Sequence, residues 1–167
     1  MGETYAEAGV SRLPTAKTNL IKFLLVVLTV ASVILTVTVS GVLFTFVLVC
    51  IMAISFIFPR LNVEYEYVYC DGQIDFDRIS GKAKRKRMLR IDMEQVEIVA
   101  PETSHALDSY RNNKSFTLKN FSSLRKDAKT YAIYSASGES RYRILFEPSE
   151  KMLECMRYKA PRKVTIQ

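Results

Sequence analysis

The sequence predicts a mixed α+β, mainly β protein, in which an N-terminal two-helix transmembrane hairpin precedes a small antiparallel β-barrel capped by a C-terminal helix. Three features predict it. A long apolar stretch near the N-terminus carries almost no charge, short segments after it alternate apolar and polar residues, and the last segment repeats methionine and leucine at helical spacing. We therefore expect a disordered cytoplasmic tail over residues 1–19, the hairpin over 20–58 and one cytoplasmic domain over 59–167.

The apolar stretch over residues 20–58 contains one formal charge, at Lys22. A bilayer core of about 30 Å is crossed by about 20 helical residues, so the stretch is nearly twice too long for one span. We expect two spans, near 20–39 and 42–58, separated at Ser40-Gly41, where glycine relaxes the backbone. Helices of soluble proteins have a polar face, and this stretch has none.

Cations flank the apolar stretch on both sides, with Arg12, Lys17 and Lys22 at its start and Arg60 at its end. By the positive-inside rule, we expect a multi-pass protein of the cell (cytoplasmic) membrane with both termini in the cytoplasm. No Asp, Glu, Arg or His lies in the middle of a span, so the hairpin is interpreted as an anchor. Its hydroxyl-bearing residues also permit close helix packing, within the hairpin or with other membrane proteins. They are Thr29, Ser32, Thr36, Thr38, Thr45 and Ser55.

The predicted cytoplasmic domain is basic. Residues 59–167 hold 21 of the 24 Lys and Arg residues and 15 of the 17 Asp and Glu residues. A basic domain beside a membrane is attracted to anionic headgroups by about 1 kcal/mol per well-placed cation. Cys50, Cys70 and Cys155 have no metal-ligand spacing and are interpreted as reduced thiols, and no cofactor is expected.

The first strands form a hairpin. Residues 62–70 alternate tyrosine or valine with glutamate, and Asp71-Gly72 is typical of a two-residue turn. This turn places the aromatic side chains on one face and brings two carboxylates together, a like-charge pair that neighbouring cations must offset. The predicted pairs are Tyr69 with Ile74, Tyr67 with Phe76 and Glu66 with Asp77.

A basic strand follows the Ser80-Gly81 turn and supplies the candidate contacts for anionic lipid. The candidates are Lys82, Lys84, Arg85, Lys86, Arg87 and Arg90. A two-residue turn sets Lys84 opposite Asp77 and Lys86 opposite Asp75, whereas a three-residue loop sets Arg85 and Arg87 opposite the same carboxylates. In either register one alternate set of cations is paired and the other is free for anionic lipid. The simpler interpretation is a charge ladder alone. The run lacks interleaved aromatic residues for base stacking, so nucleic acid is not an expected partner.

The rest of the chain predicts further short elements. A strand over 96–100 precedes a polar loop over 102–114 with a solvated His105, and a short strand covers 114–120. A second hairpin joins 130–136 to 140–147 through Ser137-Gly138. Its predicted pairs are Ile133 with Tyr142 and Tyr131 with Ile144.

A C-terminal helix is predicted from Ser149, which caps the first turn, to Ala160-Pro161. Met152, Leu153 and Met156 recur on one face of this helix and are expected to pack against the sheet.

Residues 63–101 resemble the bacterial PH-like domains found beside transmembrane helices. The resemblance lies in the order strand, Asp71-Gly72 turn, strand, Ser80-Gly81 turn, basic strand, short turn and strand. The closing hairpin and helix, through residue 163, resemble those of an uncharacterised family of small bacterial membrane proteins with two transmembrane helices. The resemblance implies a PH-like barrel that binds lipid, peptide or a neighbouring subunit, and it carries over no catalytic residues.

We therefore expect a membrane-anchored PH-like interaction module at the cytoplasmic face of the membrane, binding a protein partner or the anionic membrane surface. The alternative is a structural or accessory subunit of a larger membrane complex assembled through the hairpin. An enzyme is not expected, since the sequence has no Ser/His/Asp, Cys/His or metal constellation and no Gly-rich phosphate loop. Asp75 and Asp77 lie beside cations and are interpreted as ion-paired.

Overall fold

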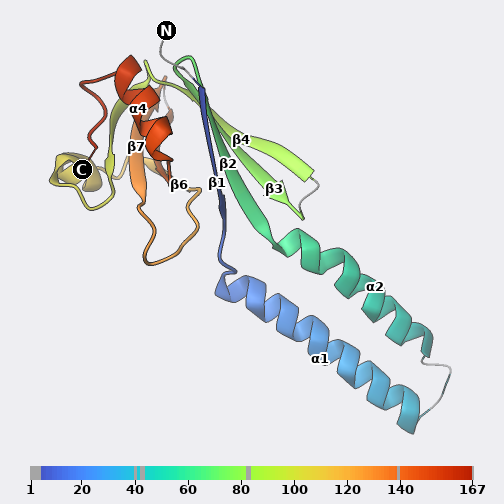
Figure 1. Ribbon diagram of the computed structural model, residues 1–167. Coiled ribbons are helices and arrows are strands. Elements are labelled where there is room, and N and C mark those ends of the chain that lie inside the picture. Colours follow the sequence, from blue (N-terminus) through green and yellow to red (C-terminus); the bar gives the residue numbers. More distant parts are fainter. Residues whose placement is uncertain (1–4, 40, 42–43, 82–83, 139, 167) are drawn as a thin grey trace.

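The computed structural model describes residues 5–39, 41, 44–81, 84–138 and 140–166. Two apolar helices project from a domain built of two sheets and a C-terminal helix (Figure 1). In chain order the elements are β1 (Tyr5–Ser11), α1 (Ala16–Thr38), α2 (Phe44–Leu61), β2 (Val63–Cys70), β3 (Gln73–Ser80), β4 (Lys84–Asp92), β5 (Val96–Pro101), the short 3-10 helix η2 (His105–Leu107), α3 (Asp108–Arg111), β6 (Thr117–Asn120), β7 (Tyr131–Ser137), β8 (Ser140–Phe146) and α4 (Glu150–Lys159).

The strands form two four-stranded sheets, and the predicted closed antiparallel barrel is wrong. One sheet has the order β1-β2-β3-β4 and the other β5-β7-β8-β6, with β6 parallel to β8. Closure would require β4 to pair along its outer edge. The first half of β4 is a run of exposed cations, which stay solvated at a sheet edge and discourage further pairing. The α+β class is confirmed.

One apolar core lies between the two sheets. Tyr67 and Phe76 from the first sheet meet Phe146 from the second, with ring centroids 5.6 Å apart for Tyr67 and Phe146 and 5.8 Å for Phe76 and Phe146. The Tyr67 hydroxyl donates a 2.6 Å hydrogen bond to the backbone oxygen of Phe121. Burial raises the pKa of Tyr67, so this hydroxyl stays protonated and remains a donor.

The first hairpin has the predicted register. Tyr69 pairs with Ile74, Tyr67 with Phe76 and Glu66 with Asp77. The turn that sets this register contains Asp71 and Gly72, both with positive φ. A two-residue turn of this kind matches the twist of the strands that it joins.

The disordered tail expected over residues 1–19 is not found over its described part, residues 5–19. Tyr5–Ser11 forms β1, which pairs antiparallel with β2 along its whole length. Ala6 is 2% exposed and belongs to the core, and α4 packs against the same strand. The domain therefore consists of chain from both sides of the two helices, and a fragment that begins at Asn62 lacks an edge strand.

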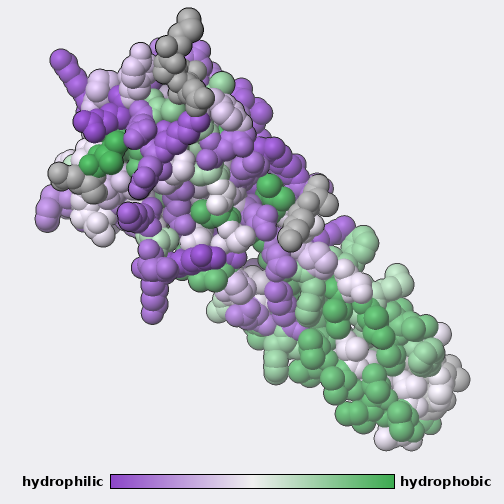
Figure 2. Space-filling view, viewed as in Figure 1, coloured by the Kyte–Doolittle hydropathy of each residue, from purple (hydrophilic) through white to green (hydrophobic). Residues whose placement is uncertain are grey.

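The two apolar helices run side by side (Figure 1) and are long and apolar enough to cross a membrane. Figure 2 shows apolar side chains over both helices and mostly hydrophilic side chains over the domain. Helix α1 begins at Ala16, before the predicted start of the first span, and α2 continues through Pro59 to Leu61. The predicted break falls between the helices, with Gly41 described and Ser40 outside the described residues.

The second hairpin forms with a register different from the prediction. Ile133 pairs with Ile144, and Tyr131 pairs with Phe146. Strand β7 continues through Ser137, so the turn lies one residue later than predicted and every partner moves by two. Because side chains alternate between faces with a period of two, the apolar face is preserved. Ile133, Ile144 and Phe146 are all fully buried.

Helix α4 forms as predicted. The Ser149 side chain accepts a hydrogen bond from the Met152 amide, and Met152, Leu153 and Met156 are buried. The helix covers β1 and β2. The polar segment over 102–114 is wrongly predicted as a plain loop, because it contains η2 and α3, with Leu107 buried in a small second cluster.

The burial of Ala6 makes β1 testable. Ala6→Asp places a carboxylate in the core beside Tyr69, and we expect it to lower the free energy of unfolding by on the order of 2 kcal/mol or more. Thermal unfolding in detergent and hydrogen exchange of the β1 amides measure the effect. The matched control is Ala106→Asp at an exposed position. Equal effects of the two changes would contradict the burial of β1.

Candidate functional site

The basic strand β4 does not have either of the registers that we considered from the sequence. Arg87 lies opposite Asp77 and Arg90 lies opposite Asp75, with a register shift beside Phe76. The shift is a β-bulge, in which β4 carries one extra residue, Met88. A bulge changes the pairing of every residue beyond it, so no turn length alone predicts this arrangement.

The arginines of β4 gather with the carboxylates on the outer face of the sheet. Arg85 reaches both Glu66, with Nη2 2.9 Å from Oε2, and Asp77, with Nε 2.6 Å from Oδ2. It thereby offsets the like-charge pair that these two carboxylates form. Arg90 binds Asp75 through two hydrogen bonds of 2.6 Å, and Arg87 lies 3.5 Å from the same carboxylate.

The lysines of β4 lie on the other face. Lys84 pairs in register with Ser80, and Lys86 pairs with Arg78. Within the described part of the chain, neither lysine makes an ion pair. Further along the sheet, this same face contributes to the apolar core. At the end near Lys84 it lies beside α2, which contacts β3.

A groove of about 610 Å³ opens where α2, β3 and β4 meet. Four cations line it, and the described residues of its wall include no carboxylate. Phe56 and Met88 add apolar surface. The four cations are Arg60, Arg78, Lys84 and Lys86.

Two contacts shape the groove. The guanidinium of Arg60 lies 4.2 Å from the ring centroid of Phe56, in a cation–π contact. Gly81 has φ of +62°, and a Cβ at this position would lie 3.3 Å from the Pro59 backbone. Glycine therefore lets the turn after β3 approach the end of α2 closely.

Arg78 is a cation of the groove with an unsatisfied side-chain donor. Its Nε is buried and has no hydrogen-bond partner among the described residues. Nearly all buried donors in folded proteins have an acceptor, and because this one has none among the described residues, the positive charge of Arg78 is not offset at this atom.

The predicted lipid contacts divide into three groups. Lys84 and Lys86 line the groove, and Lys82 lies outside the described residues. Arg85, Arg87 and Arg90 are held in ion pairs on the opposite face.

Arg60 and Arg78 also line the groove, although neither was among the lipid contacts expected from the sequence. Strand alternation could have indicated Arg78, because it follows Asp77 and must face the other way. Arg60 joins the site only through the packing of α2 against the sheet, for which the sequence holds no local signal.

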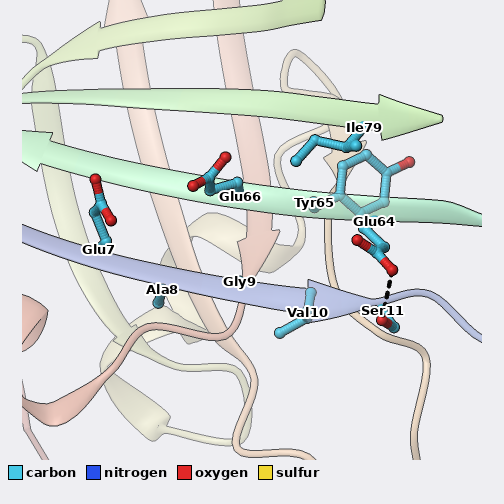
Figure 3. Close-up of a pocket in the computed structure, with 9 residues that line it drawn as sticks. All are labelled: Glu7, Ala8, Gly9, Val10, Ser11, Glu64, Tyr65, Glu66 and Ile79. Atoms are coloured by element: carbon cyan, nitrogen blue, oxygen red, sulfur yellow. Dashed lines mark hydrogen bonds between the residues drawn. The ribbon is translucent and has the colours of Figure 1, made fainter. Parts of the chain in front are cut away.

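A second hollow, of about 450 Å³, lies over β1 and β2 (Figure 3). Figure 3 shows Glu7 and Glu66 on one side of the strands and Ala8 pointing the opposite way. Glu64 also lines this hollow, where it accepts a 3.4 Å hydrogen bond from the Ser11 hydroxyl. The hollow is acidic and does not attract anions.

The described residues hold no cluster of three or more His, Cys, Asp or Glu side chains that could bind a metal ion. Asp75 and Asp77 are each held by arginine, which favours the ion-paired interpretation over paired acid catalysts. His105 is exposed and contacts Asp108.

The Asp75–Arg90 pair predicts a pH dependence of stability. Hydrogen bonds from Arg90 hold the pKa of Asp75 below its ordinary value of 3.8. The folded protein therefore binds this proton less readily than the unfolded chain, so the pair stabilises the fold at neutral pH and loses its effect as pH falls through the folded-state pKa. We expect Asp75→Asn to lower the melting temperature at about pH 7, and the difference from wild type to shrink below about pH 4.

The control for this change is Asp127→Asn, which removes an exposed carboxylate. Melting temperatures of both variants are measured across the same pH series. A difference between Asp75→Asn and wild type that stays constant down to about pH 2 would show that the ionised pair does not stabilise the fold.

Comparison with known proteins identifies the domain type. No curated protein and no solved structure matches the chain. The family model described as "Bacterial PH-like domain (DUF6106)" matches residues 2–166. The match includes β1, both apolar helices, both sheets and α4, and so agrees with a domain built from chain on both sides of the helices. The chain belongs to the bacterial PH-like domain family DUF6106.

Proposed function

We propose that the protein is a membrane-anchored interaction module. In this proposal α1 and α2 cross the cytoplasmic membrane and hold the PH-like domain against its inner surface, where the domain contacts anionic lipid. The observation that carries the proposal is the insertion of the two helices between neighbouring antiparallel strands, β1 and β2. PH-like domains are in general non-catalytic interaction modules, which supports a binding function.

The connections between the helices and the sheet are short. Four residues, 12–15, join β1 to α1, and Asn62 alone joins α2 to β2. Arg12 extends the pairing through a 2.9 Å backbone hydrogen bond to Val63, and its side chain binds the Tyr65 hydroxyl at 2.8 Å. With both helices leaving one end of the same strand pair, both ends of the hairpin lie on one side of the membrane.

The charge distribution supports the cytoplasmic side. Lys17 and Lys22 lie in the first turns of α1, and Arg60 lies in the last turn of α2. Cations at these positions favour retention of both helix ends in the cytoplasm. The groove cations Lys84 and Lys86 lie beside the same end of α2 and so face the membrane surface in this arrangement.

Tethering makes a weak surface interaction sufficient. A domain held within tens of ångströms of its target meets it at about millimolar effective concentration. The cations therefore need only modest affinity for lipid headgroups to fix the orientation of the domain.

The alternative, a subunit assembled through the hairpin, has less support from the contacts of α1. Ser32 is 2% exposed and lies in the contact with α2, where Val47 and Cys50 are also buried. The hydroxyls of Thr29 and Thr36 donate to carbonyls of their own helix. These groups are used within the hairpin, which leaves the domain as the better candidate for the interaction surface.

The anchoring is tested by thiol labelling from each side of sealed membrane vesicles. One variant keeps Cys70, an exposed residue of the domain, and carries Cys50→Ala and Cys155→Ala. The other replaces all three cysteines and carries Gly41→Cys, where a Cβ has open space. We expect a membrane-impermeant maleimide to label Cys70 only from the cytoplasmic side and the thiol at position 41 only from the opposite side. Labelling of both from one side would show that the helices do not cross.

A further inference from the structure

We infer that the groove between α2, β3 and β4 is a specific site for one anionic phospholipid, with the phosphate held by Arg78, Lys84 and Lys86 and an acyl chain lying along α2. This inference rests on the proposed function, because it takes α2 as a membrane-spanning helix. It goes beyond general attraction to a charged surface, since it names a built site and its ligand.

The charges of the groove favour the binding of an anion. Arg60, Arg78, Lys84 and Lys86 come from three different elements and converge on one hollow that has no carboxylate among its described lining residues. On the opposite face of the same strands, every described carboxylate of β3 has an arginine partner. The fold thus places cations that are paired with carboxylates on one face and cations without carboxylate partners in the groove. The groove cations repel one another, and a bound anion would relieve this repulsion.

Arg78 gives the site its chemical preference. Arg78 lines the groove, and a guanidinium presents its donors in a planar fork that matches two phosphate oxygens. The neighbouring ammonium groups of Lys84 and Lys86 act as point charges for the remaining oxygen charge. A phosphodiester, with two unesterified oxygens, fits this arrangement.

The apolar wall favours a lipid over a soluble phosphate. Phe56 is 65% exposed and Met88 is 44% exposed, and both line the groove beside the cations. A soluble phosphate leaves these side chains in water, whereas a phospholipid covers them with its glycerol and acyl groups. The apolar surface continues from Phe56 along α2, where Met52 is 74% exposed.

The position of the groove along α2 agrees with the depth of a headgroup. Phe56 lies five residues before the end of the helix at Leu61, which is about 8 Å along the axis. Figure 2 shows the change from apolar to hydrophilic surface in the region where the helices join the domain. A lipid phosphate at this boundary keeps its charge among cations and its chains among apolar side chains.

The test is native mass spectrometry of the full chain in detergent, with phosphatidylglycerol or phosphatidylcholine added. We expect one phosphatidylglycerol to bind much more tightly than a second one or than phosphatidylcholine. The variant Arg78→Gln/Lys84→Gln/Lys86→Gln is expected to lose this affinity at least tenfold. The control Lys114→Gln/Arg157→Gln/Arg162→Gln removes the same charge from exposed positions elsewhere and is expected to change it less than twofold.

Two further measurements distinguish loss of the site from unfolding, and a lipid ligand from a soluble phosphate. Thermal unfolding confirms that each triple variant is folded, and the single change Lys86→Gln replaces the triple variant if that one unfolds. Inorganic phosphate and glycerol 3-phosphate are added as competitors. Displacement of the lipid by either at equal concentration would overturn the assignment to a lipid.

Equal loss of affinity in the groove and control variants would mean that general charge attraction binds the lipid, and would overturn the site while leaving the anchor in place. Failure of the thiol-labelling pattern would instead overturn the anchor. The two proposals therefore fail through different measurements.

Discussion

The pairing of β1 with β2 is the constraint on which the rest of the structure depends. It joins chain from before the helices to chain after them, and α4 then covers the joined strands. On the core face, each large ring of β2 lies opposite a small side chain of β1. The pairs are Tyr65 with Val10, Tyr67 with Ala8 and Tyr69 with Ala6. Because the connections to the helices are so short, this one pairing also fixes where α1 and α2 leave the domain.

The sorting of charge on β3 and β4 follows from two simple rules of strand geometry. Neighbouring side chains point to opposite faces, so a run of consecutive cations divides into two sets. The bulge at Met88 then resets the alternation, which brings Arg90 to the outer face with Arg85 and Arg87 and leaves Lys84 and Lys86 on the inner face. A sequence of uniform positive charge thus produces one neutralised surface and one basic groove.

Local signals predicted most of the elements, and long-range contacts account for the differences. Asp71-Gly72 is compatible with one turn position, so the register of the first hairpin could be predicted. The segment around Gly138 is compatible with two turn positions that differ by one residue, so the register of the second hairpin could not. Strand β1 consists largely of small residues with weak strand preference and forms because β2 and α4 are there to cover it. The division into two sheets and the approach of Arg60 to the groove arise where elements meet, which composition and periodicity do not encode.

Because α1 and α2 lie between β1 and β2 in the sequence, the first sheet can be completed only after both helices have been synthesised. β1 is synthesised first, yet its partner β2 emerges only after both helices. If the helices cross the membrane as proposed, a chain with only one of them inserted leaves β1 and β2 on opposite sides, with Ala6 and its partner Tyr69 separated by the bilayer. The first sheet then keeps an open edge at β2, which is available for pairing with other chains. Completion of this sheet therefore requires that both helices of the hairpin are inserted.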